Sequence, residues 1–137
     1  MSVYFASVGL YMKVGYSKDP VGRAASLTTG KAQYRPADIE RGAHADLIGW
    51  FPGDHAAERA AHMALGRKHV MCEWFIDCPE VRDYLRYQDD AVLVHELSAL
   101  ALLAVLRGLP VADAATTYPL GSMDEALDAM AAARRAS

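Results

Sequence analysis

The side chains best able to act on a phosphate group lie at Tyr4, Lys13, Arg23 and Glu58. A guanidinium carries a planar fork of donors that suits phosphate oxygens, and a carboxylate can hold a divalent cation. The first three residues fall in a stretch that alternates β-prone runs with a glycine and then changes to helix signals. His62 follows Glu58 by one helical turn and could orient that carboxylate or act as a base.

A hairpin has to position Tyr4 relative to Lys13. Residues 3–8 and 11–16 are rich in β-branched and aromatic residues and predict two strands. If Gly9-Leu10 is a two-residue turn with glycine first, Tyr4 faces Gly15, and Tyr4 and Lys13 share a face as diagonal neighbours. A three-residue loop would reverse the parity and separate them. We expect the two-residue turn.

Two helices and a third strand complete the arrangement. Ser17 or Asp19 is a good helix cap before Pro20, and the predicted helix runs to about Thr28 with Arg23 at the edge of the sheet. Residues 45–51 predict a third strand. Asp54 caps a second helix over about 55–69, on which His55, Glu58 and His62 share one face.

Composition limits the class of protein. The 137 residues favour one domain with an appendage, and 53% hydrophobic residues can build a core. A net charge of -3 argues against DNA binding by bulk charge, so any nucleic-acid contact should come from a local patch. Cys72 and Cys78 fit neither a zinc motif nor a disulfide framework. With no signal pattern and no membrane-length apolar run, we expect a soluble, cytoplasmic protein.

The order of elements resembles that of the GIY-YIG nuclease superfamily, in the phage-associated branch named for the T5 Orf172 DNA-binding domain. The resemblance covers about residues 2–78, and is carried by Val3-Tyr4-Phe5, by Tyr11 to Ser17, by Asp19-Pro20 with Arg23 and Leu27, by Glu58 and His62, and by Glu73-Trp74-Phe75. It implies an α+β fold with a small antiparallel (mixed) three-stranded sheet flanked by helices in residues 1–80. Residues 81–137 would form a helical C-terminal extension.

The resemblance also implies roles. Tyr4 stands at the tyrosine of the GIY element, Lys13 replaces the tyrosine of the YIG element, and Arg23 stands at the phosphate-binding arginine. Glu58 stands at the single metal-binding carboxylate, which would hold Mg²⁺ or Mn²⁺, and His62 matches a position typical of the branch. Tyr4 or Lys13 could then orient or deprotonate the attacking water. The basic residues expected to contact DNA are Lys18, Lys31, Arg35 and Arg41.

The resemblance implies a metal-dependent DNA endonuclease, a hydrolase of phage or mobile-element type, in the cytoplasm of a bacterial or phage-infected cell. The YIG tyrosine is absent and the GIY element is reduced to Ser2-Val3-Tyr4, so a non-catalytic DNA-binding regulator is the alternative. A protein-interaction factor that modulates a defence system is a third hypothesis. Each residue also has an ordinary interpretation: Tyr4 as a strand tyrosine, Lys13 as a solvated lysine, and Arg23 and Glu58 as surface ion pairs. His55, Glu58 and His62 could instead bind zinc.

The second half of the chain is more apolar. Residues 92–107 predict one helix, and from Val92 to Leu106 it is hydrophobic nearly all round, which favours burial on every side. We expect this helix to pack on the back of the sheet and on its counterpart in a homodimer. Burial within the monomer, under a tail helix that begins at Ser122, is the alternative.

Overall fold

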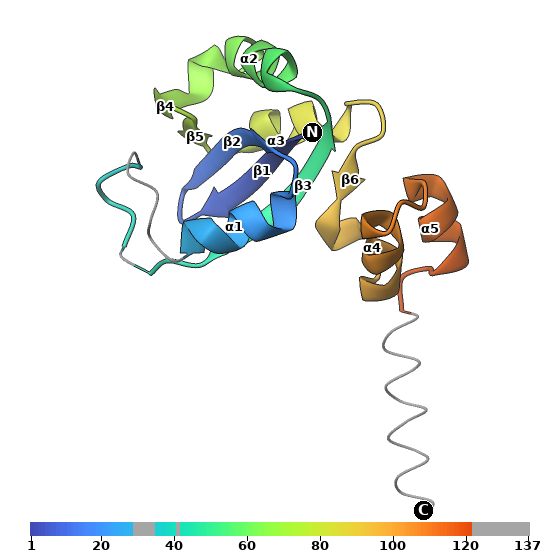
Figure 1. The fold of residues 1–137 in the computed structure, drawn as a ribbon. Coiled ribbons are helices and arrows are strands. Elements are labelled where there is room, and N and C mark those ends of the chain that lie inside the picture. Colours follow the sequence, from blue (N-terminus) through green and yellow to red (C-terminus); the bar gives the residue numbers. More distant parts are fainter. Residues whose placement is uncertain (29–34, 41, 122–137) are drawn as a thin grey trace, which may run out of the picture. The chain divides into compact units, whose positions relative to one another are not determined.

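The computed structural model describes residues 1–28, 35–40 and 42–121, in two compact units that divide between Val92 and Leu93 (Figure 1). The sequence predicted a boundary after residue 80. The helix α3 (Pro79–Arg86) therefore belongs to the first unit, which also holds the hairpin and both helices predicted to carry the site.

The chain has the predicted α+β class, but the prediction of three strands was wrong. Six strands form one sheet in the order β4-β5-β2-β1-β3-β6, namely β1 (Ser2–Val8), β2 (Tyr11–Ser17), β3 (Ala45–Pro52), β4 (His69–Met71), β5 (Trp74–Ile76) and β6 (Val92–Leu93). The added strands are β4, β5 and β6, of which β4 and β6 lie at the sheet's two edges. With two or three residues each they are too short to produce an alternating pattern in the sequence.

The β1–β2 hairpin has the predicted register. Tyr4 pairs with Gly15 and Ala6 pairs with Lys13, so Tyr4 and Lys13 lie on one face of the sheet. Gly9 takes a φ of +59°, which glycine adopts without strain. The two-residue turn is thus confirmed.

Helices cover both faces of the sheet (Figure 1). The helix α1 (Pro20–Thr28) begins after Asp19, whose carboxylate accepts from the Gly22 amide at 3.0 Å, and it buries Ala24 and Leu27. The helix α3 covers the opposite face, where the ring of Tyr84 stacks 6.5 Å from that of Phe5.

The helix α2 (His55–Ala64) begins at the predicted cap, Asp54, whose carboxylate accepts from the amides of Ala56 and Ala57. It ends earlier than the predicted His69. A 3₁₀ turn over Gly66–Lys68 follows, because the chain must reverse here to enter β4.

The second unit does not contain the predicted helix over residues 92–107. After the 3₁₀ turn Val94–Glu96, Ser98 caps a shorter helix, α4 (Ala99–Leu106), by accepting from the Ala101 amide at 3.1 Å. The strand β6 and the cap interrupt the apolar run, which composition alone could not reveal.

A further helix, α5 (Val111–Thr117), packs on α4, and Ala101 and Ala114 are fully buried. Leu103 and Leu106 of α4 are about half exposed, at 49% and 48%. Packing on the sheet and self-association through α4 stay predictions, and the tail helix predicted from Ser122 lies outside the described residues. In the part of the chain that the structure describes, no helix is long and apolar enough to cross a membrane.

Candidate functional site

The Tyr4 hydroxyl lies near two of the other predicted site residues, Arg23 and Glu58. Tyr4 is 1% exposed, and its ring lies across Gly15, where a Cβ atom would stand 2.7 Å from the hydroxyl oxygen. Only glycine leaves room for the ring there. Burial raises the pKa of Tyr4, while a hydrogen-bonding interaction with Arg23 and the charge of that guanidinium lower it.

Arg23 approaches this hydroxyl from α1. Its side chain is largely exposed, so the guanidinium lies at the rim of the site, where a phosphate in solution could reach it. Of the other predicted DNA contacts, Lys18 is exposed between β2 and α1, and Arg35 donates to the Glu40 carbonyl at 2.9 Å. Lys31 and Arg41 lie outside the described residues.

Lys13 is not the solvated lysine of the ordinary interpretation. It is 7% exposed, its Nζ lies 2.7 Å from Glu73 Oε2, and the same nitrogen stands 5.4 Å from the centre of the Trp74 ring. Lys13 pairs across the strands with Trp74, the residue after Glu73. Sequence reasoning missed Glu73 as a site residue because the register of the three-residue strand β5 could not be predicted.

Glu58 projects from α2 and is 4% exposed. Its Oε1 lies 3.7 Å from His62 Nε2, and its buried Oε2 has no hydrogen-bond partner among the described residues. Burial raises the pKa of Glu58, as does the charge of Glu73, whereas His62, His55 and Lys13 lower it. The charges of Glu58 and Glu73 also raise the pKa of Tyr4, which places both carboxylates near the phenol.

His62 anchors α2 to the edge of β2. Its Nε2 lies 2.8 Å from the Val14 carbonyl oxygen, and its ring meets Phe75 edge-on with centroids 5.1 Å apart. Because a carbonyl only accepts, Nε2 must carry a proton and donate it. The Val14 amide donates to the Glu73 carbonyl at 2.9 Å, the last backbone contact of β2 with this segment, and His62 then contacts the Val14 carbonyl. This geometry makes His62 a positioning residue and leaves Nδ1 as its only possible basic atom.

Glu58 Oε2 is buried and has no hydrogen-bond partner among the described residues, and a carboxylate oxygen is a possible ligand for a divalent cation. Within the described residues there is no group of three or more His, Cys, Asp and Glu side chains that could hold a metal, so the three-ligand zinc site is not formed there. A cation at Glu58 would take its other ligands from water and phosphate oxygens, as Mg²⁺ commonly does.

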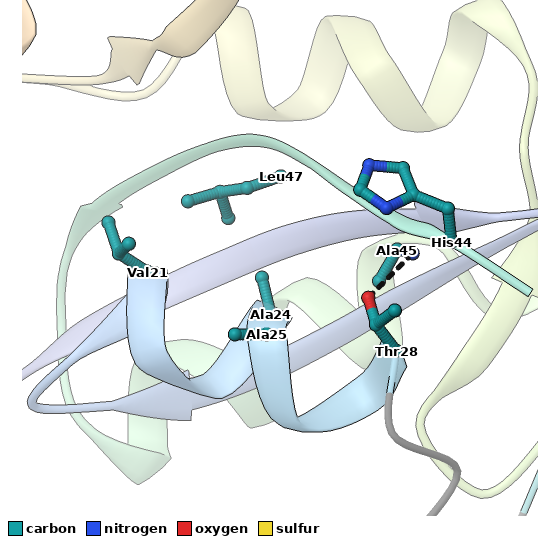
Figure 2. A pocket seen from close by; sticks show the side chains of 7 residues that line it. All are labelled: Val21, Ala24, Ala25, Thr28, His44, Ala45 and Leu47. Atoms are coloured by element: carbon teal, nitrogen blue, oxygen red, sulfur yellow. Dashed lines mark hydrogen bonds between the residues drawn. The ribbon is translucent and has the colours of Figure 1, made fainter. Parts of the chain in front are cut away.

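A hollow lies between α1 and β3 and has a volume of about 410 Å³ (Figure 2). Its described lining is mainly aliphatic, from Val21 and Ala24 on the helix to Leu47 on the strand. The Thr28 hydroxyl at one end accepts from the Ala45 amide at 3.0 Å. The hollow therefore offers apolar contact rather than the charged groups that the cluster around Tyr4 provides.

Comparisons with protein-family models, curated proteins and solved structures gave no match. Function must be inferred from the site itself. One end of the first unit brings together Tyr4, Arg23, Glu58 and the ion pair of Lys13 with Glu73. The assignment to the GIY-YIG nucleases stays a hypothesis.

Proposed function

We propose that the protein is a metal-dependent endonuclease that hydrolyses phosphodiester bonds in DNA, with a site of the GIY-YIG type. The observation that carries the proposal is the burial of Glu58 with one oxygen that has no partner among the described residues, beside the Tyr4–Arg23 pair. Leaving a buried polar group unpaired costs about 1–3 kcal/mol, and more for a charge. A cation ligand accounts for a carboxylate kept at that cost.

Glu58 is the residue that would hold Mg²⁺ or Mn²⁺. When bound, such an ion supplies a Lewis acid that stabilises the negative charge on the phosphate and the leaving oxygen. The buried setting strengthens this interaction, because few waters compete for the carboxylate there.

The remaining side chains supply binding and proton transfer. Arg23, which is exposed, would bind the phosphate oxygens, and because it lies beside Tyr4 the scissile group would then lie near the phenol. Tyr4 would first have to lose its own proton to solvent, a loss that the Arg23 guanidinium and a cation at Glu58 would favour, and the phenolate would then accept the proton of the attacking water. The water oxygen then bonds to phosphorus, the bond from phosphorus to the leaving oxygen breaks, and that oxygen takes up a proton from solvent.

A non-catalytic DNA-binding regulator is the second candidate. It is favoured by the raised pKa of Tyr4, which keeps the phenol protonated at neutral pH, and by the 2.7 Å ion pair that engages Lys13. In that case Arg23 and exposed basic residues such as Lys18 would contact the phosphates without cleavage. The hypothesis of a defence-modulating interaction factor has no observation of its own.

A nicking assay with supercoiled plasmid separates the candidates. The endonuclease should nick DNA with Mg²⁺ or Mn²⁺, and Glu58→Ala should abolish nicking. Glu80→Ala, which changes an exposed glutamate of α3, should not.

A gel shift provides the second arm. Binding without nicking in the wild type, lost in Arg23→Ala and kept in Arg59→Ala on the exposed side of α2, would support the regulator. Metal-dependent nicking that survives Glu58→Ala would contradict the proposed site.

A further inference from the structure

The ion pair of Lys13 with Glu73 has a geometry that bears on proton transfer. Lys13 lies on the face that carries Tyr4, and its side chain is 9% exposed, whereas that of Glu73 is 38% exposed. Glu73 belongs to the turn between β4 and β5, and its carbonyl accepts from the Val14 amide at 2.9 Å. The turn is thereby fixed to β2, and the carboxylate is held over the lysine.

We propose that Glu73 is a positioning residue that holds Lys13 as an ammonium ion, so that Lys13 serves as a fixed cation for the phosphate and not as the base. The catalytic consequence rests on the proposed endonuclease function. The charge state of Lys13 does not depend on that function, because it follows from contacts within the folded chain.

Two contacts and one nearby charge favour the ammonium. A carboxylate oxygen 2.7 Å away stabilises the charged form, as does the buried carboxylate of Glu58, whose pKa in turn is lowered by Lys13. The face of Trp74 at 5.4 Å adds a cation–π interaction. Burial of the amine opposes these contacts. A base, in contrast, would need a neutral amine with a free lone pair.

Arginine tests the role because its guanidinium stays charged and cannot act as a base. Lys13→Arg should retain nicking within roughly 10-fold of the wild type, whereas Lys13→Met should lose at least roughly 100-fold, since a fixed charge near the phosphate is worth that much. If Lys13 is the base, both variants should be equally inactive, and this result from two folded variants overturns the proposal. Circular dichroism and thermal melts establish that each variant folds.

A direct measurement avoids dependence on nuclease activity. The chain has four lysines, and ¹³Cε labelling with NMR can follow the protonation of Lys13 against Lys18, Lys31 and Lys68. The titratable and charged groups on the elements around Lys13 include Tyr4, Arg23, His55, Glu58, His62 and Glu73. Since the charge of Glu73 also raises the pKa of Tyr4 and Glu58, the Lys13 signal is more decisive than a rate profile.

The wild type should show an ammonium at Lys13 throughout the neutral range. In Glu73→Gln the ¹³Cε signal of Lys13 at pH 7 should change, because the 2.7 Å ion pair is lost, and in Glu80→Gln it should not change. A neutral Lys13 amine near pH 7 in the wild type, or an unchanged Lys13 signal in Glu73→Gln, overturns the proposal. If the wild type has the ammonium but never nicks DNA, the endonuclease function fails while the role of Glu73 in charging Lys13 stands.

Discussion

Asp77 and Glu58 are two carboxylates of the first unit with opposite environments. Asp77 accepts from the Ser7 hydroxyl at 3.0 Å and from Arg82 Nε and Nη2 at 2.8 and 2.9 Å. The Arg82 guanidinium holds the pKa of Asp77 below its usual range. Glu58 is more deeply buried, one of its oxygens lacks a partner in the described part of the chain, and its pKa is raised.

The difference separates a structural carboxylate from one available to a ligand. Asp77 connects β1, through Ser7, with α3, through Arg82, and all its oxygens are used within the fold. Buried polar groups are nearly always satisfied in this way. Glu58 departs from that rule next to Tyr4, where a phosphate and a cation could supply what the chain does not. Unsatisfied groups of this kind concentrate at functional sites because ligand binding compensates their cost.

The largest expected effect is on nicking by Glu58→Gln. The amide has nearly the shape of the carboxylate but lacks its charge, so it should lose the cation and reduce the rate at least roughly 100-fold. The matched change Asp77→Asn should alter the rate by less than about 3-fold at a temperature where it is folded, since Asp77 contacts Ser7 and Arg82 rather than the site. Initial rates on supercoiled plasmid measure both. An equal loss of nicking rate in Glu58→Gln and Asp77→Asn would contradict the different roles given to the two carboxylates.

The free energy of unfolding, in contrast, should depend more on Asp77 than on Glu58. Asp77→Asn should lower the free energy of unfolding by about 1.5 kcal/mol at pH 7, because charge-assisted hydrogen bonds are lost but Arg82 is 45% exposed and partly screened. Because the pKa of Asp77 is lowered in the folded state, its carboxylate stabilises the fold at pH values above the unfolded-state pKa. This stabilisation is lost as the pH falls through the folded-state pKa. The wild type and Asp77→Asn should therefore converge at acid pH in urea titrations. Asp83→Asn, an exposed change on α3, is the control, and a constant difference down to pH 2 would contradict the assignment.

Much of this site follows from local sequence rules, and the rest depends on contacts between distant segments. The glycine-first turn at Gly9 set the register, and the register placed Tyr4 beside Lys13. The cap at Asp54 set the start of α2 and hence the turn of helix that bears Glu58. Glu73 could not be identified as a site residue from the sequence, because it is brought to Lys13 by the pairing of the three-residue strand β5 with β2. The strand β6 was hidden for a similar reason, since Val92–Leu93 begins an apolar run that also suits a helix.

The smallest expected effect, on the order of 1 kcal/mol, is the pH dependence of stability that Glu58 itself causes. A carboxyl whose folded pKa is raised binds more protons in the folded state than in the unfolded state, so stability falls as pH rises from the ordinary value of 4.5 through the raised one. Urea titrations from pH 4.5 to 8 should show this decline in the wild type but not in Glu58→Gln. Subtracting the two curves cancels the histidines that both proteins share.

The same difference curve tests the ligand. Mg²⁺ should restore stability to the wild type at pH 8, because a cation that binds only the folded state stabilises it by mass action, and it should leave Glu58→Gln unchanged. A flat difference curve without metal would show that Glu58 finds a partner in solution. An equal Mg²⁺ response in both proteins would place the cation elsewhere, and Glu58 would then belong with Asp77 among the carboxylates that serve the fold alone.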